Sequence, residues 1–134
     1  MTEGDAQEWL AYADGDLHYA RLGQKDADAL ESLIVFHAQR AIEKALKAVL
    51  VGHEVDFPKT HDLEQRVEII EEAGIAWPAG LNKVLQFTTF ATQGRYPGFG
   101  DPITDADVEE AIVMAEKVLV WAKQQVAGAP GAGP

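Results

Sequence analysis

The residues of this sequence best suited to chemistry are cations and histidines that their spacing brings together. Arg40 and Lys44 stand four residues apart in a stretch, 30–50, that lacks Gly and Pro and is rich in helix-forming residues. A helical wheel places both on one polar stripe, with His37 at its edge. The stripe also contains Gln39, Glu43 and Lys47. Because like charges at this spacing repel, the pair indicates an anionic partner; the simpler interpretation is a solvated face with an internal ion pair.

Each of the two histidines near this chemistry has two interpretations. His37 is either a packed side chain satisfied by a neighbour or a member of a polar cleft beside Arg40. His61 belongs to Thr60-His61-Asp62-Leu63, which predicts a helix N-terminus capped by Thr60. In the simpler interpretation His61 is only exposed there, and in the other it contributes to a binding site.

A second group of candidates stands on a predicted turn, Arg95-Tyr96-Pro97-Gly98. Pro97 stiffens this turn, so Arg95 and Tyr96 are displayed at little cost in entropy. If the fold brings the turn against the central helix, Arg40, Lys44 and Arg95 can hold one phosphate group. The alternative is that Arg95 bridges to an acid such as Asp101.

The sequence lacks the residues that a metal site, a Gly-rich phosphate-binding loop or a serine nucleophile would require. The sequence has no cysteine, and its four histidines do not stand at the spacing that puts two metal ligands on one helical face. No Gly-rich phosphate loop and no Ser nucleophile with a partner are present. We therefore expect no metal, no cofactor and no catalytic residue.

Composition predicts one acidic globular domain. The chain has 134 residues, 47% hydrophobic residues and a net charge of −11, which opposes non-specific nucleic-acid binding. The domain is expected over residues 1–126, followed by a disordered tail of Gly, Ala and Pro over 127–134. No run approaches the roughly 20 apolar residues of a membrane span, and the acidic N-terminus does not resemble a signal peptide, so a cytoplasmic location is expected.

The apolar periodicity predicts an all-α, up-and-down bundle of four to five helices. We expect these over about 6–22, 30–51, 61–73, 81–93 and 105–126, with Asp26 or Asp28 capping the second and Gly23 ending the first. The residues expected in the core are Leu17, Ala41, Ile42, Ala45 and Ile112, with Trp9 partly buried.

The last predicted helix has an unusually wide apolar arc. Met114, Val118 and Trp121 extend it to about half the circumference, more than one core-facing stripe requires. Phe36 also falls in the polar sector of the central helix. Both features indicate a homodimer, while the alternative for the last helix is burial between two others.

Three stretches together resemble the HEPN family (higher eukaryotes and prokaryotes nucleotide-binding). They are 38–48, the Thr60-His61-Asp62-Leu63 segment and Arg95-Tyr96-Pro97, supported by Trp9 and Asp16-Leu17, and the similarity spans about residues 6–125. The resemblance implies an all-α bundle that pairs as a homodimer, commonly encoded beside a minimal nucleotidyltransferase in a toxin–antitoxin-like pair. Some relatives are metal-independent ribonucleases in which an Arg is followed after four to six residues by His.

This sequence departs from the ribonuclease pattern. After Arg95 the positions where His should stand are Gly100, Asp101 and Pro102, and no other Arg is followed by His at that spacing. We therefore expect a non-catalytic dimeric module that binds a nucleotide or RNA phosphate, or a nucleotidyltransferase partner. Two alternatives remain: a ribonuclease with an atypical active site, and a structural protein without a ligand. The residues expected at the site are Arg40, Lys44, Arg95, His37, His61 and Tyr96.

Overall fold

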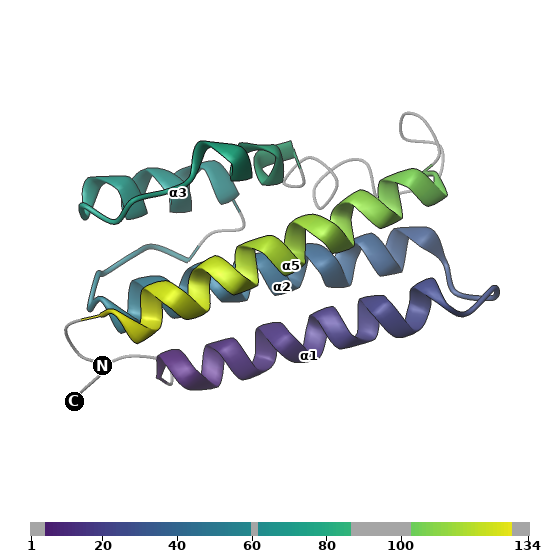
Figure 1. Ribbon diagram of the computed structural model, residues 1–134, viewed down its shortest axis with the longest axis horizontal. Coiled ribbons are helices and arrows are strands. Elements are labelled where there is room, and N and C mark those ends of the chain that lie inside the picture. The colour runs from purple at the N-terminus through teal and green to yellow at the C-terminus, as the bar shows by residue number, and fades with distance from the viewer. Residues whose placement is uncertain (1–4, 60–61, 87–102, 130–134) are drawn as a thin grey trace.

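A computed structural model describes residues 5–59, 62–86 and 103–129 of the chain, and all regular structure in these residues is helical. The elements are α1 (Ala6–Gln24), α2 (Glu31–Gly52), α3 (Leu63–Glu72), the 3-10 helix η1 (Ala79–Gln86) and α5 (Asp105–Ala127). Figure 1 shows α1, α2 and α5 running side by side, with α3 and η1 along the other side of α5 and α2. The predicted all-α bundle is confirmed.

Capping residues account for most of the helix ends. Asp5 with Glu8 and Thr104 with Asp107 form reciprocal capping boxes at the starts of α1 and α5. α5 ends at Ala127, one residue beyond the predicted end. Gly74, whose φ is +82°, follows the end of α3 and provides the left-handed conformation that stops it.

Two predicted boundaries are wrong, and the type of a third helix differs from the prediction. α3 begins at Leu63 and is capped by Asp62, whose carboxylate accepts from the Gln65 amide, instead of being capped by Thr60. α2 has Leu30 at its N-cap with no side-chain cap, so neither Asp26 nor Asp28 caps it. Where the structure describes the predicted helix over 81–93, it has the 3-10 helix Ala79–Gln86 in place of an α-helix, and residues 87–93 lie outside the described part.

α1 also continues through Gly23, which does not end it. Gly23 has a packing role instead. A Cβ at this position would lie 2.8 Å from Cγ1 of Ile34, so only a glycine lets the last turn of α1 approach α2 this closely.

α2 is the central helix of the core. The alanines at 38, 41, 45 and 48 are all at most 1% exposed, which lets neighbouring helices pack closely against it. The predicted core is confirmed: Leu17, Ala41, Ile42, Ala45 and Ile112 are buried, and Trp9 is partly buried.

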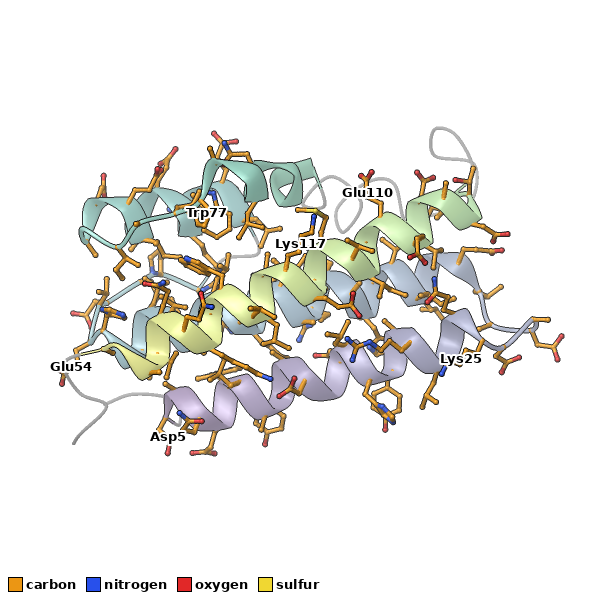
Figure 2. All side chains as sticks on the ribbon, in the orientation of Figure 1. Asp5, Lys25, Glu54, Trp77, Glu110 and Lys117 are labelled. Atoms are coloured by element: carbon orange, nitrogen blue, oxygen red, sulfur yellow. The ribbon has the colours of Figure 1, made fainter. Side chains whose placement is uncertain are left out.

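The wide apolar arc of α5 is covered within the chain. Met114, Val118 and Trp121 are buried, and the Trp121 ring packs edge-to-face on Trp77 with ring centroids 5.0 Å apart. Figure 2 labels the Trp77 side chain, which precedes η1 in the chain. The Trp121 indole N–H donates to the Ala76 carbonyl at 3.2 Å. Burial between other elements therefore explains this arc, and it gives no indication of a dimer.

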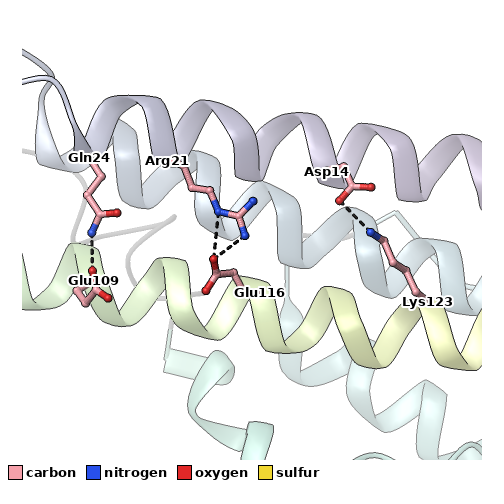
Figure 3. Close-up of polar contacts among 6 residues, drawn as sticks. All are labelled: Asp14, Arg21, Gln24, Glu109, Glu116 and Lys123. Carbon is pink, nitrogen blue, oxygen red and sulfur yellow. Dashed lines mark hydrogen bonds and ion pairs between the residues drawn. The ribbon is translucent and has the colours of Figure 1, made fainter.

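Polar contacts join α1 to α5 along their exposed edge (Figure 3). Arg21 donates to Glu116, Lys123 pairs with Asp14 at 3.1 Å, and Gln24 donates to Glu109. Each of these cations has a carboxylate of the same chain beside it. This edge, which we call the α1–α5 seam, is therefore internally neutralised.

No helix in the described ranges has both the length and the apolarity needed to cross a membrane.

Candidate binding face of helices α1 and α2

The predicted basic residues of the central helix lie on its least covered side. Arg40, Lys44 and Lys47 recur at i, i+4 and i+7 and are partly exposed, as is His37. These four residues form what we call the α2 strip. The adjacent side chains of α1 on this face are Trp9, Tyr12, Asp16 and Tyr19.

Asp16 is at the centre of this face. One of its carboxylate oxygens accepts from Lys44 Nζ at 2.5 Å, and the other lies 3.1 Å from His37 Nδ1. The Asp16 side chain is only 12% exposed, so water screens these contacts weakly. His37 thus has a neighbour for its ring nitrogen, as in the simpler of its two interpretations, and its side chain stays 38% exposed on the strip beside Arg40. Lys44 already has a carboxylate, which makes it a poorer phosphate ligand than the sequence indicates.

Aromatic rings surround the cations of the strip. Lys47 Nζ lies 4.6 Å from the Trp9 ring centroid and Lys44 Nζ lies 5.7 Å from that of Tyr12. The Arg40 guanidinium lies 5.7 Å from the Phe36 ring. The His37 and Tyr19 ring centroids are also 5.7 Å apart. Such contacts contribute about 0.5–1 kcal/mol each at exposed sites and hold the long side chains in place.

Arg40 differs from Lys44 in its surroundings. Within the described part of the chain it forms no ion pair with a carboxylate, and its one ring contact is with Phe36. An Arg that stacks on a ring keeps its planar set of N–H donors available to an external anion. Arg40 is therefore the residue of the strip best placed to bind a negatively charged group.

The polar stripe predicted on α2 is not a single solvated face. Gln39 and Glu43 are buried, at 1% and 5% exposure, and Gln39 Nε2 donates to Glu43 Oε2 at 3.1 Å. Arg66 of α3, 1% exposed, belongs to the same cluster, with its guanidinium 5.1 Å from the Phe57 ring. Desolvation lowers the pKa of Arg66, and the negative charge of Glu43 opposes that shift.

This buried cluster and Asp16 are the polar features that the sequence-based site prediction missed. A signal existed in both cases: Arg66 interrupts the apolar positions Leu63, Val67 and Ile70 of a short helix, and Asp16 precedes the core residue Leu17. A charge at a core-facing position requires a partner, and here the partners come from a different helix.

Three of the six predicted site residues lie together, and three cannot be placed. His37, Arg40 and Lys44 share the α2 strip, as predicted. His61, Arg95 and Tyr96 lie outside the described residues. Among the residues that are described, no group of three or more His, Cys, Asp or Glu side chains could hold a metal ion.

Exposed apolar side chains concentrate near the strip. The described part of the chain exposes six large hydrophobic side chains, and five of them belong to α1 or to the start of α2. They are Tyr12, Tyr19, Leu22, Leu30 and Leu33, between 50% and 63% exposed. The last four gather toward the α1–α2 connection, and we call them the hairpin patch.

Comparison with known proteins identifies the family. The HEPN domain model matches residues 6–125, nearly the whole chain. The crystal structure of ST0689, an archaeal HEPN homologue, is 24% identical and superposes with a TM-score of 0.72, over 92% of this chain and 98% of that chain. No curated protein matches the sequence. A helical bundle of this topology, matched by the family model over this length, makes the chain a member of the HEPN domain family.

Proposed function

We propose that this chain is a non-catalytic HEPN interaction module that binds a protein partner through the exposed face of α1 and α2. The observation that carries the proposal is the placement of its exposed apolar side chains. Five of the six in the described part belong to α1 or to the start of α2, and Tyr12 and Tyr19 contact the strip, while α5 contributes only Val120. Clusters of this kind mark protein–protein contact sites.

The composition of the face supports a protein partner over a nucleic acid. Tyr, Trp, Phe and Arg are the residues that interfaces favour, and here Tyr12, Tyr19, Phe36 and Arg40 stand together. The charge of Lys44 is already offset by Asp16. The chain as a whole carries a net charge of −11, which repels a phosphate backbone. The partner classes are a second copy of the chain and a minimal nucleotidyltransferase.

A nucleotide or RNA phosphate is the second candidate ligand, and Arg40 favours it. Among the described residues no carboxylate pairs with its guanidinium, so an external phosphate is a suitable acceptor. Titration of ATP, GTP and short RNA at low salt into the wild type and Arg40→Ala/Arg95→Ala tests this candidate. Binding by the wild type that the double variant loses would support it. Equal binding by both proteins would exclude this site.

The ribonuclease alternative requires a histidine outside the usual motif. His37 is 38% exposed at its side chain and contacts Asp16, an arrangement that orients an imidazole. Metal-independent RNA cleavage by the wild type, lost in His37→Ala but retained in His18→Ala, would make the protein an enzyme and overturn the non-catalytic proposal.

The protein-partner proposal is tested by placing charge in the hairpin patch. Leu30 and Leu33 are 61% and 55% exposed, so Leu30→Glu/Leu33→Glu should leave the free energy of unfolding within about 0.5 kcal/mol of wild type. Sedimentation velocity and titration calorimetry, on the protein alone and with a nucleotidyltransferase encoded beside it, should show loss of association. Val120→Glu, an exposed change on α5, is the control. Association that survives the leucine changes would refute the proposal.

A further inference from the structure

The hairpin patch is one surface formed by both α1 and α2. The Tyr19 and His37 rings, one from each helix, have their centroids 5.7 Å apart. Leu22 follows Tyr19 by one turn of α1. Leu33 precedes His37 by one turn of α2, and Leu30 stands one turn before Leu33. These spacings place the exposed side chains of the patch on the same side of the α1/α2 face, next to the end where the two helices are joined (Figure 1).

Carboxylates border this patch at the joined end. Asp26, Asp28 and Glu31 are exposed, and within the described residues none of them forms an ion pair. Asp26 accepts from the amide of Asp28 at 2.9 Å, a contact that leaves its charge in place. Lys25 is the one cation of the connection between the two helices. The patch therefore has a negative border of three carboxylates, which we call the acidic rim.

The arginines of α1 and α2 do not neutralise the acidic rim. Arg21, in the last turn of α1, is paired with Glu116 of α5. Arg40 stands nine residues after Glu31, about 13.5 Å along α2 at about 1.5 Å per residue. Salt screens interactions beyond about 8 Å at physiological ionic strength, so Arg40 offsets the rim only weakly. A partner that covers the leucines of the patch therefore meets a net negative border.

The acidic rim discriminates between the kinds of partner that could cover the patch. A second copy docked patch to patch about a two-fold axis would oppose each rim to its own equivalent. Like charges brought together across an interface oppose association, whereas opposite charges favour it. The chemistry that suits both the patch and its rim is an apolar surface flanked by Lys or Arg.

We propose that the hairpin patch binds an amphipathic segment of a different protein, whose apolar side chains cover Leu22, Leu30 and Leu33 and whose flanking Lys or Arg side chains face the acidic rim. This inference rests on the proposed interaction function and names the chemistry of the partner. Apolar anchors supply the affinity of such a contact, and flanking charges supply specificity and faster association. The association should therefore weaken as the salt concentration rises.

Two peptides that differ only in charge test the chemistry of the partner. Each has about 18 residues, the same leucines at i, i+3, i+4 and i+7, and either Lys or Glu at every flanking position. Titration calorimetry at low salt should show that the wild type binds the Lys peptide with a dissociation constant at least about tenfold lower than that of the Glu peptide. Raising the salt concentration should reduce this ratio.

Neutral variants locate the charge that the Lys peptide meets. Asp28→Asn/Glu31→Gln removes two charges from the acidic rim and should weaken binding of the Lys peptide at least about fivefold. Glu64→Gln/Glu68→Gln removes two charges from exposed positions of α3, which lies on the other side of the bundle (Figure 1). This α3 variant is the matched control, because it changes the net charge equally, and it should bind the Lys peptide like wild type. Circular dichroism checks that both variants are folded.

Removal of apolar surface completes the test. Leu30→Ser/Leu33→Ser keeps the net charge and should abolish binding of the Lys peptide. Weakening by the rim and leucine variants but not by the α3 control supports the inference. Equal weakening by the rim and α3 variants would show that overall charge attracts the peptide, and it overturns the inference. A leucine variant that binds like wild type, or a wild type that binds neither peptide, overturns it as well.

Failure of this inference is distinguishable from failure of the proposed function. Equal binding of both peptides, lost in Leu30→Ser/Leu33→Ser, would refute a basic partner and leave the interaction module standing. Self-association of the wild type in sedimentation equilibrium that the leucine variant abolishes, with no peptide bound, would identify a second copy as the occupant and overturn the inference. The proposed function itself fails if association with a protein partner survives Leu30→Glu/Leu33→Glu.

Discussion

The two long edges of α1 use their charges differently. Along the α1–α5 seam, Arg21 and Lys123 pair with Glu116 and Asp14, all at exposed positions (Figure 3). Along the α1/α2 face, Lys44 shares the partly buried Asp16 with His37, and the other cations rest on aromatic rings. In the α1–α5 seam the charges are neutralised within the chain by exposed ion pairs, each of which contributes little to the free energy of unfolding. The α1/α2 face retains positive charge and apolar surface, which is what a binding face requires.

A charge placed in the buried face of α2 should have the largest effect on the free energy of unfolding. Ala45 is fully buried on α2, so Ala45→Glu adds both volume and an unpaired charge to the core. We expect a loss of more than about 3 kcal/mol in the free energy of unfolding, measured by urea denaturation. Ala27→Glu, at an exposed position, should melt like wild type. If Ala45→Glu does too, the assignment of the buried face of α2 is wrong.

A smaller loss of stability should distinguish the carboxylate of the α1/α2 face from that of the α1–α5 seam. Asp16→Ala leaves Lys44, 21% exposed at its side chain, without its carboxylate, and we expect a loss of about 1–3 kcal/mol. Asp14→Ala removes a carboxylate that is 51% exposed, and the loss should stay below about 1 kcal/mol. Parallel urea titrations measure both. Equal losses would mean that burial does not distinguish the two carboxylates.

The smallest effects on stability are expected for two arginine changes that should differ clearly in their effect on association. Arg21→Ala and Arg40→Ala should each change the free energy of unfolding by less than about 1 kcal/mol. Only Arg40→Ala should weaken association, because Arg21 is occupied by Glu116. Sedimentation equilibrium at low salt compares them. Equal weakening by both changes would place the interface elsewhere or spread it over both edges.

The sequence predicts the helices and core well because these depend on local periodicity. The apolar spacing alone identifies Leu17, Ile42 and Ile112, and the Asp5 and Thr104 capping boxes are readable from four residues each. Of the α1/α2 face, the sequence predicts only the part that α2 contributes. His37, Arg40 and Lys44 share a helix, so their proximity follows from their spacing.

What the sequence could not provide is contact between helices. Lys44 looks available until Asp16 of α1 is placed beside it, and Gln39 looks solvated although the fold leaves it 1% exposed. The wide arc of α5 was misleading for the same reason, since Trp77 and η1 cover its outer part. Periodicity identifies which face of a helix is apolar but not which element covers that face.

The three tryptophans give this molecule built-in optical reporters. Trp9 lies on the α1/α2 face with the Lys47 ammonium over its ring, so its emission should respond to whatever displaces that cation or excludes water there. Trp77 and Trp121 form an edge-to-face pair whose electronic transitions couple, which gives a near-ultraviolet dichroism signal that depends on the packing of η1 against α5. Trp9→Phe and Trp77→Phe separate the two signals. Events at the binding face and opening of the opposite side of the bundle can thus be followed in one cuvette without a label.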